Sequence, residues 1–120
     1  MSDEGAGRPP REWRFYLEDM IGFAEKVLVY TEGLDQQAFA ASGLNYDATL
    51  RNLELIGEAA ARIPTGVRDS APEVPWRLII ATRNRLIHGY LGIDNDILWS
   101  IIQSDIPDLL TQLARLKGAV

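Results

Sequence analysis

The sequence has no cysteine and a single histidine, His88. Without cysteine, the chain cannot form disulfides, thiolate metal sites or a cysteine nucleophile. A single histidine also argues against a histidine-rich metal site within one chain. We therefore expect neither a bound metal ion nor a cofactor.

Positive charge is in the minority. The 120 residues include 12 lysines and arginines against 17 aspartates and glutamates, which gives a formal net charge of -5. The isoelectric point, about 4.8, argues against broad coating of nucleic acid, because that mode of binding requires an extended basic face. It leaves room for a small basic cleft on an acidic body.

Long apolar runs are absent as well. No run approaches the ~18–20 residues that a membrane span requires, and residues 1–8 lack the apolar core of a signal peptide. The 47% share of hydrophobic residues is typical of one globular domain with a single core. We expect a cytoplasmic protein with a disordered tail over residues 1–8 and one domain over residues 9–120.

Apolar residues recur at helical spacing, and no segment has the alternation of a β-strand. Pro9 and Pro10 begin the first long helix, and Gly33 ends it. Two sets of residues spaced by seven give this helix a wide buried stripe. They are Trp13, Met20 and Val27, and Tyr16, Phe23 and Tyr30.

Two further helices follow. Asp35 caps a short helical turn that ends at Ser42 and Gly43, and a longer helix runs over residues 45–63 and stops at Pro64. Gly57 lies beside the buried stripe of the longer helix, where it allows close packing or a kink. That stripe comprises Tyr46, Leu50, Leu53, Ile56, Ala60 and Ile63.

The end of the chain is also helical. Residues 65–75 form a loop or a single helical turn, and Asp94 or Asn95 caps a helix after residue 93. Pro107 either kinks that helix or lies in the first turn of a new one. The expected buried residues are Ile97, Leu98, Ile101, Ile102, Leu109, Leu110, Leu113 and Leu116. The pattern predicts an all-α, up-and-down bundle of four to five main helices.

The candidate functional residues are concentrated in residues 76–90. The pattern predicts a helix that starts after Pro75 and ends at Gly89. Residues 74–93 hold three arginines (Arg77, Arg83 and Arg85) and no acid, so this helix is a local positive region. At 100° per residue, one stripe that should be buried contains an arginine at its centre. Its members are Trp76, Ile80, Arg83, Ile87 and Tyr90.

A second stripe on this helix contains His88, together with Arg77, Ala81 and Asn84. A lone histidine is more often structural than catalytic, but the last turn of a helix favours an imidazolium that can exchange protons. The Arg83 fork suits a phosphate, and Asn84 could orient the ring or bind a substrate oxygen. An imidazole with a guanidinium suffices for RNA cleavage without a metal.

The spacing of Arg83 and His88 argues against a shared site on one straight helix. Arg83 and His88 are five residues apart, about 140° around a straight helix, so their side chains diverge. A shared site requires either that the helix ends at His88 or that two copies of the motif face each other in a homodimer. The paired carboxylates Glu54 and Glu58 are either a solvated face or a partner for Arg83 across the bundle.

At these residues the chain resembles the HEPN superfamily of helical ribonucleases, and more narrowly the HepT-like toxins. The resemblance rests on the eight residues Arg83–Tyr90, which read Arg-Asn-Arg-Leu-Ile-His-Gly-Tyr. Supporting matches are Leu55–Ala60, Pro72–Arg77 and Ile93–Pro107, the last with Trp99 and Asp105. Together these segments extend over the last two thirds of the chain.

The resemblance implies a homodimer with a cleft lined by both copies of Arg83 and His88, supported by Asn84, Arg77 and Arg85. It implies a metal-independent endoribonuclease toxin of a type VII-like toxin–antitoxin system. The implied partner is a minimal nucleotidyltransferase antitoxin that adds AMP to Tyr90. The alternative is a non-catalytic helical partner of such a nucleotidyltransferase that binds nucleotide or RNA.

Overall fold

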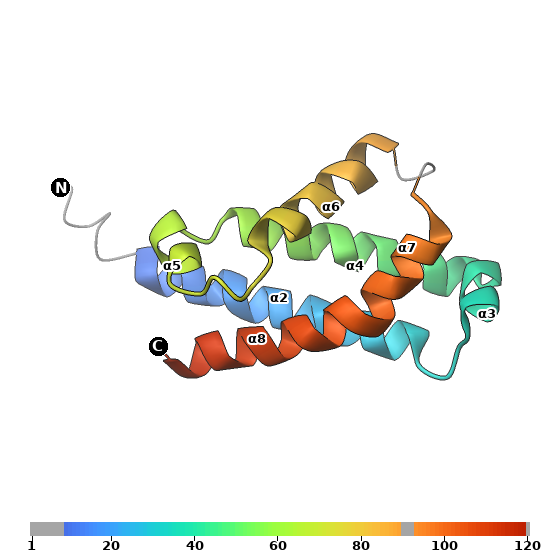
Figure 1. Cartoon of the computed structure of the whole chain (residues 1–120), viewed down its shortest axis with the longest axis horizontal. Coiled ribbons are helices and arrows are strands. Elements are labelled where there is room, and N and C mark those ends of the chain that lie inside the picture. Colours follow the sequence, from blue (N-terminus) through green and yellow to red (C-terminus); the bar gives the residue numbers. More distant parts are fainter. Residues whose placement is uncertain (1–8, 90–92, 120) are drawn as a thin grey trace.

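The computed structural model describes residues 9–89 and 93–119, and every regular element within them is helical (Figure 1). In chain order the elements are α2 (Pro9–Thr31), α3 (Gln36–Ala41), α4 (Gly43–Ala61), α5 (Thr65–Asp69), α6 (Trp76–Gly89), α7 (Asn95–Ser100), the π-helical segment η2 (Ile101–Asp105) and α8 (Ile106–Ala119). The predicted all-α bundle is confirmed. The tail predicted over residues 1–8 lies outside the described residues.

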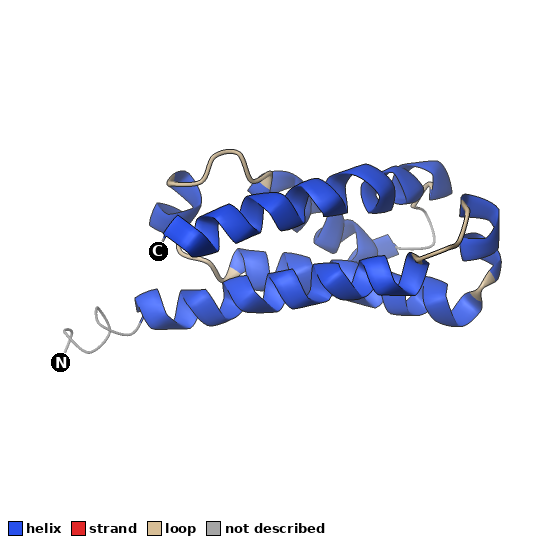
Figure 2. Ribbon diagram, turned by 90° about the horizontal axis from the view of Figure 1, so that it is seen from below, coloured by secondary structure: helices blue, strands red, loops and turns tan. Residues whose placement is uncertain are grey.

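The long helices alternate in direction. α2 packs against α4, which returns antiparallel to it, and α8 runs back along α2 (Figures 1 and 2). α6 packs on α4 and diverges from the bundle axis toward its C-terminal end (Figure 1). The helix that carries the candidate chemistry thus lies at the margin of the bundle.

Local sequence signals set most of the helix boundaries. Gly33 has a φ of 76°, a left-handed conformation that glycine adopts without steric cost, and it lies two residues beyond the end of α2. Asp35 caps α3 by accepting a hydrogen bond from the Ala38 N–H at 2.8 Å. Asp94 caps α7 by accepting from the N–H groups of Asp96 and Ile97. Of the two caps predicted for α7, the structure selects Asp94.

Pro107 lies in the first turn of α8, and the chain before it is π-helical. Proline has no N–H, and its ring crowds the carbonyl group four residues earlier. The preceding turn widens, so that the Ile106 N–H bonds to the Ile101 carbonyl oxygen, five residues back. One of the two predicted alternatives, a proline in the first turn of a new helix, is confirmed.

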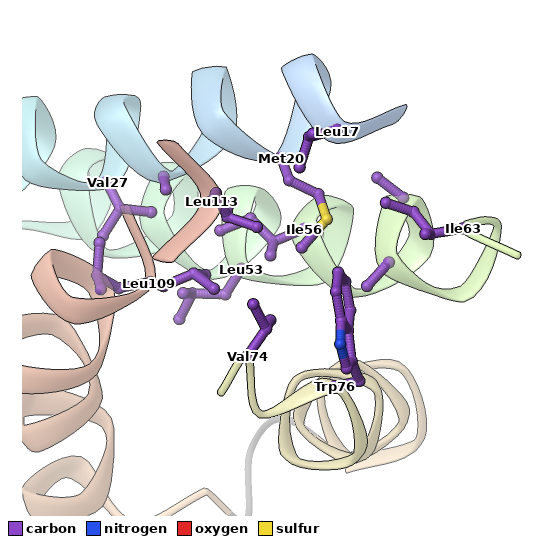
Figure 3. Packing of buried hydrophobic residues seen from close by; sticks show 14 of the residues in the cluster. Leu17, Met20, Val27, Leu53, Ile56, Ile63, Val74, Trp76, Leu109 and Leu113 are labelled. Carbon is purple, nitrogen blue, oxygen red and sulfur yellow. The ribbon is translucent and has the colours of Figure 1, made fainter. Parts of the chain in front are cut away.

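The core lies among α2, α4 and α8, and Val74 and Trp76 contribute from the segment that leads into α6 (Figure 3). Met20, Val27 and Leu113 are fully buried, with 0% of each residue exposed to solvent. The predicted burial of Ile97 is wrong, because this residue is 51% exposed. It lies in the first turn of α7, where the neighbouring Leu98 side chain points inward instead.

An aromatic cluster joins the helices at one end of the bundle. The Phe39 ring of α3 lies between Tyr46 of α4 and Trp99 of α7, with ring centroids 5.2 and 5.4 Å apart. The Tyr46 hydroxyl also donates to Asn95 Oδ1 at 3.1 Å. These contacts hold α7 on α4, directly after the connection from α6.

Candidate active site

The start of α6 is anchored by Trp76, whose side chain is buried. Its indole Nε1–H donates to the carbonyl oxygens of Arg68 and Ala71, both at 3.1 Å. Because the indole ring fills the core while its N–H is satisfied by the preceding loop, the helix begins at a defined place. The helix bounds predicted from Pro75 and Gly89 are confirmed by α6.

The buried face of α6 differs from the predicted stripe. Leu86 is 5% exposed and therefore buried, whereas Ile87, which was expected inside, is 40% exposed. Trp76 and Leu86 are buried on the inward face, and Ile79 and Ile80 are both partly buried beside them. The predicted stripe is therefore wrong at its C-terminal end, where the packing of α6 on α4 buries Leu86 in place of Ile87, and helical spacing alone does not show this packing.

The crossing takes place at Gly57 of α4. A Cβ atom added to Gly57 would collide with the Cβ of Arg83, and it would lie 2.8 Å from the Arg83 Cγ and 3.1 Å from the Ile79 carbonyl oxygen. The predicted role of Gly57 in close helix packing is confirmed. Nothing in the sequence indicated that Gly57 would contact Arg83.

Arg83 is partly buried by this contact, and its guanidinium extends beyond it. Its Nη1 donates to Asn84 Oδ1 at 3.0 Å, while Nε is enclosed and has no hydrogen-bond partner among the described residues. Within that part of the chain, Arg83 has no ion pair with Glu54 or Glu58. Glu54 instead pairs with Arg51 at 3.3 Å, so the alternative of a neutralising glutamate across the bundle is not realised.

His88 lies in the last turn of α6, and its side chain is exposed. Asn84 is exposed on the preceding turn, but its carbonyl oxygen binds Arg83, so the suggested role of orienting the imidazole is not seen. The structure brings Arg83 and Asn84 together, whereas no hydrogen bond joins Arg83 to His88 within the described residues. Five residues of helix place them about 7.5 Å apart along the axis and point them in different directions.

The remaining predicted site residues divide into two groups. Arg77 and Arg85 are exposed on α6, and no described residue of this helix is acidic, so its outer surface is positive on a chain of net charge -5. Tyr90 follows the last residue of α6 and lies outside the described residues. Leu78 and Ile87 add exposed apolar area to the same helix, at 52% and 40%.

Residues 9–89 and 93–119 contain no candidate metal site and no candidate membrane span. No group of three or more histidine, cysteine, aspartate or glutamate side chains in these residues could hold a metal ion. No helix among them is long and apolar enough to cross a membrane.

Comparison with known proteins gives consistent results. Residues 20–116 match the family model described as "Ribonuclease HepT-like". A protein of Thermococcus cleftensis named "Probable ribonuclease HepT" is 35% identical over 107 residues, which cover 89% of this chain and 97% of that protein. "Putative RNase MJ1380" of Methanocaldococcus jannaschii is 36% identical over 99 residues, covering 82% and 91% of the two chains. No solved structure gives a significant match.

The matched region contains the whole of α4 and α6, with the Arg83–His88 pair, and it includes about half of α2 and most of α8. The chain therefore belongs to the HepT-like ribonuclease family.

Proposed function

We propose that this protein is a metal-independent endoribonuclease toxin that cleaves RNA in a cleft between two copies of α6. The observation that carries the proposal is the arrangement on α6, where a partly buried, oriented Arg83 precedes an exposed His88 on a helix without acids. Membership of a ribonuclease family supports RNA as the substrate.

The proposed chemistry uses the ribose 2′-hydroxyl as the nucleophile. One His88 imidazole accepts the 2′-hydroxyl proton, and the 2′-oxygen attacks the adjacent phosphorus. The guanidinium of Arg83 stabilises the charge that develops on the phosphorane oxygens. The bond from phosphorus to the 5′-oxygen then breaks, and a protonated imidazole supplies the proton to that oxygen. The products are a 2′,3′-cyclic phosphate and a 5′-hydroxyl.

A homodimer is proposed because the two groups diverge on one helix. A two-fold arrangement of α6 helices can bring Arg83 of one copy near His88 of the other, which a single straight helix cannot do for its own pair. The exposed apolar side chains of Leu78 and Ile87 support an interface on this helix. Arg77 and Arg85 would bind the phosphates that flank the cleaved bond.

The proposed partner is a minimal nucleotidyltransferase antitoxin of a type VII-like toxin–antitoxin system. In this scheme, the Tyr90 hydroxyl attacks the α-phosphorus of ATP and pyrophosphate leaves, so that AMP is attached to the tyrosine. The attached phosphate would place a bulky anion beside the positive groups of α6 and exclude RNA. Tyr90 is two residues beyond His88 in sequence, which supports its access to the same cleft.

Tyr90→Phe tests this control. After co-expression with the nucleotidyltransferase, intact-mass spectrometry should show added AMP on the wild type and none on Tyr90→Phe. The variant should remain toxic in the presence of the partner. A wild-type chain that is inhibited yet unmodified would show that neutralisation is by binding alone.

The nuclease itself is tested with purified protein on tRNA and mRNA in the presence of EDTA. Cleavage should persist with EDTA, disappear with His88→Ala and fail on a substrate carrying a 2′-deoxyribose at the cleaved position. Activity that needs magnesium, or that accepts the 2′-deoxy substrate, would exclude this mechanism. RNA binding by the wild type without any cleavage would favour the non-catalytic alternative.

A further inference from the structure

Gly57 differs from the other described glycines in what surrounds it. Its missing side chain leaves space that the Cβ and Cγ of Arg83 and the Ile79 carbonyl oxygen occupy. A Cβ atom added at Gly22, Gly33, Gly43, Gly66 or Gly118 would meet no atom within 4 Å. The close approach of α6 to α4 is thus concentrated at one position, and that position touches Arg83.

The contact restrains the base of the Arg83 side chain. Its Cβ and Cγ rest on the backbone of α4 at Gly57, and the adjacent Nε atom is enclosed. At the other end of the side chain, Nη1 donates to Asn84 Oδ1 at 3.0 Å. The guanidinium is therefore held at its base by α4 and at its tip by α6, although it lies at the margin of the bundle.

We propose that Gly57 is a positioning residue for Arg83, which sets the direction of the guanidinium toward the RNA phosphate. This inference rests on the proposed function, in which Arg83 stabilises the phosphorane. A guanidinium binds phosphate through a planar fork, so its effect depends on orientation as well as on charge. A displacement of about 1 Å at a catalytic group can lower the rate by ~10²-fold.

The critical variant is Gly57→Ala, with Gly22→Ala as its matched control. Each change adds one methyl group to the interior of a long helix, where alanine has the higher helix propensity. At Gly57 the methyl group must displace Arg83 and α6, whereas at Gly22 it enters open space. Gly57→Ala should lower kcat by about 10²-fold with little change in KM for RNA, and Gly22→Ala should change neither.

Loss of stability alone must be separated from loss of orientation. Leu113→Ala serves as a destabilised control, because it creates a cavity in the hydrophobic core. Leu113 lies in α8, on a different helix from Arg83 and far from it in sequence. Assayed below the melting temperature of each variant, Leu113→Ala should keep its kcat. If Gly57→Ala retains the wild-type kcat as well, or if both variants lose kcat in proportion to their lowered melting temperatures, the positioning role is overturned.

The variant Arg83→Ala separates the positioning role of Gly57 from the role of Arg83 in cleavage. An inactive Arg83→Ala together with a fully active Gly57→Ala would overturn the positioning role and leave the proposed function intact. Full activity of Arg83→Ala would overturn the role of Arg83 in cleavage, and the positioning role would fall with it.

A measurement on the wild type covers the case in which Gly57→Ala does not fold. In ¹⁵N NMR spectra of the intact protein, the Arg83 Nε–H should exchange slowly with water and show restricted motion, because Nε is enclosed. Arg77, which is exposed on the same helix, provides the mobile reference. Arg83→Lys assigns the signal, and an Arg83 Nε–H as mobile as that of Arg77 would contradict the proposal.

Discussion

α6 and the α2–α4–α8 bundle differ in how strongly their side chains are buried. The three bundle helices bury apolar side chains against one another, and residues such as Met20, Val27 and Leu113 lose all contact with solvent. α6 packs chiefly on α4, and more than half of its residues with a described side chain are exposed. Hydrophobic burial therefore stabilises the bundle, while α6 presents arginines and a histidine that contribute little to stability.

Substitutions in the two regions should therefore separate effects on stability from effects on cleavage. A residue exposed on α6 can be replaced at almost no cost in folding, yet it can remove a reacting group. A core residue of the bundle has the opposite effect. The contact between Gly57 and Arg83 joins the two regions, and packing at this contact is expected to control activity directly.

The largest expected effect is that of His88→Ala on cleavage. Loss of a proton-transferring imidazole should lower kcat by about 10²–10⁴-fold. Because His88 is exposed, the free energy of unfolding should change by no more than about 0.5 kcal/mol. Cleavage kinetics and urea unfolding of the same preparation measure both quantities. A large loss of stability would show that His88 is structural and would erase the contrast between the two regions.

Leu113→Ala should show the reverse behaviour. Leu113 is 0% exposed in α8, and the cavity left by the substitution should lower the free energy of unfolding by about 2–5 kcal/mol. The folded fraction should cleave RNA at the wild-type rate, since α8 contributes no group to the proposed site. Denaturant unfolding gives the stability, and assays at low temperature give the rate per folded molecule. A kcat reduced as strongly as that of His88→Ala would contradict the separation.

Mixing two inactive variants tests whether α6 acts as a pair. If each site takes Arg83 from one copy and His88 from the other, half of the dimers in an equal mixture of Arg83→Ala and His88→Ala contain one intact site out of two. Activity should then recover to about a quarter of the wild-type value, provided that the subunits exchange. Sedimentation should show a dimer of the 13.4 kDa chain. A fully active monomer, or no recovery after verified exchange, would exclude the composite site.

The helix boundaries could be predicted because they depend on local chemistry. Gly33, Asp35 and Asp94 each act on neighbouring backbone groups, so their effects are visible in a short stretch of sequence. The bounds of α6 followed from Pro75 and Gly89 for the same reason. The predicted apolar stripes of α2 and α8 also agree with the buried residues of these helices. A wide buried face still contains most of the predicted residues when the centre of the face is placed slightly wrongly.

The predicted inward face of α6 was correct for Trp76 and wrong for Ile87, because the C-terminal part of this face depends on a partner distant in sequence. Helical spacing placed Ile87 on the buried stripe, whereas the packing of α6 on α4 buries Leu86. The contact between Arg83 and Gly57 has the same origin. The hydrogen bond from Arg83 to Asn84 was unexpected for another reason: adjacent residues on a helix do not normally face each other.

Asn84→Ala should have the smallest effect of the predicted variants, because it removes only the contact at the tip of Arg83. The lost hydrogen bond is exposed, and bonds of this kind contribute about 0.5–1.5 kcal/mol, so cleavage should fall by roughly 2- to 12-fold. Thr82→Ala is the matched control, since it removes a side-chain hydrogen bond on α6, from Thr82 Oγ1 to the Leu78 carbonyl oxygen, that does not involve Arg83. Its kcat should equal that of the wild type. If Asn84→Ala loses as much activity as Arg83→Ala, Asn84 must contact the RNA itself; if it loses none, α4 alone orients the guanidinium. A loss of a few-fold would place Asn84 between these limits, as a secondary restraint on a side chain that Gly57 already directs.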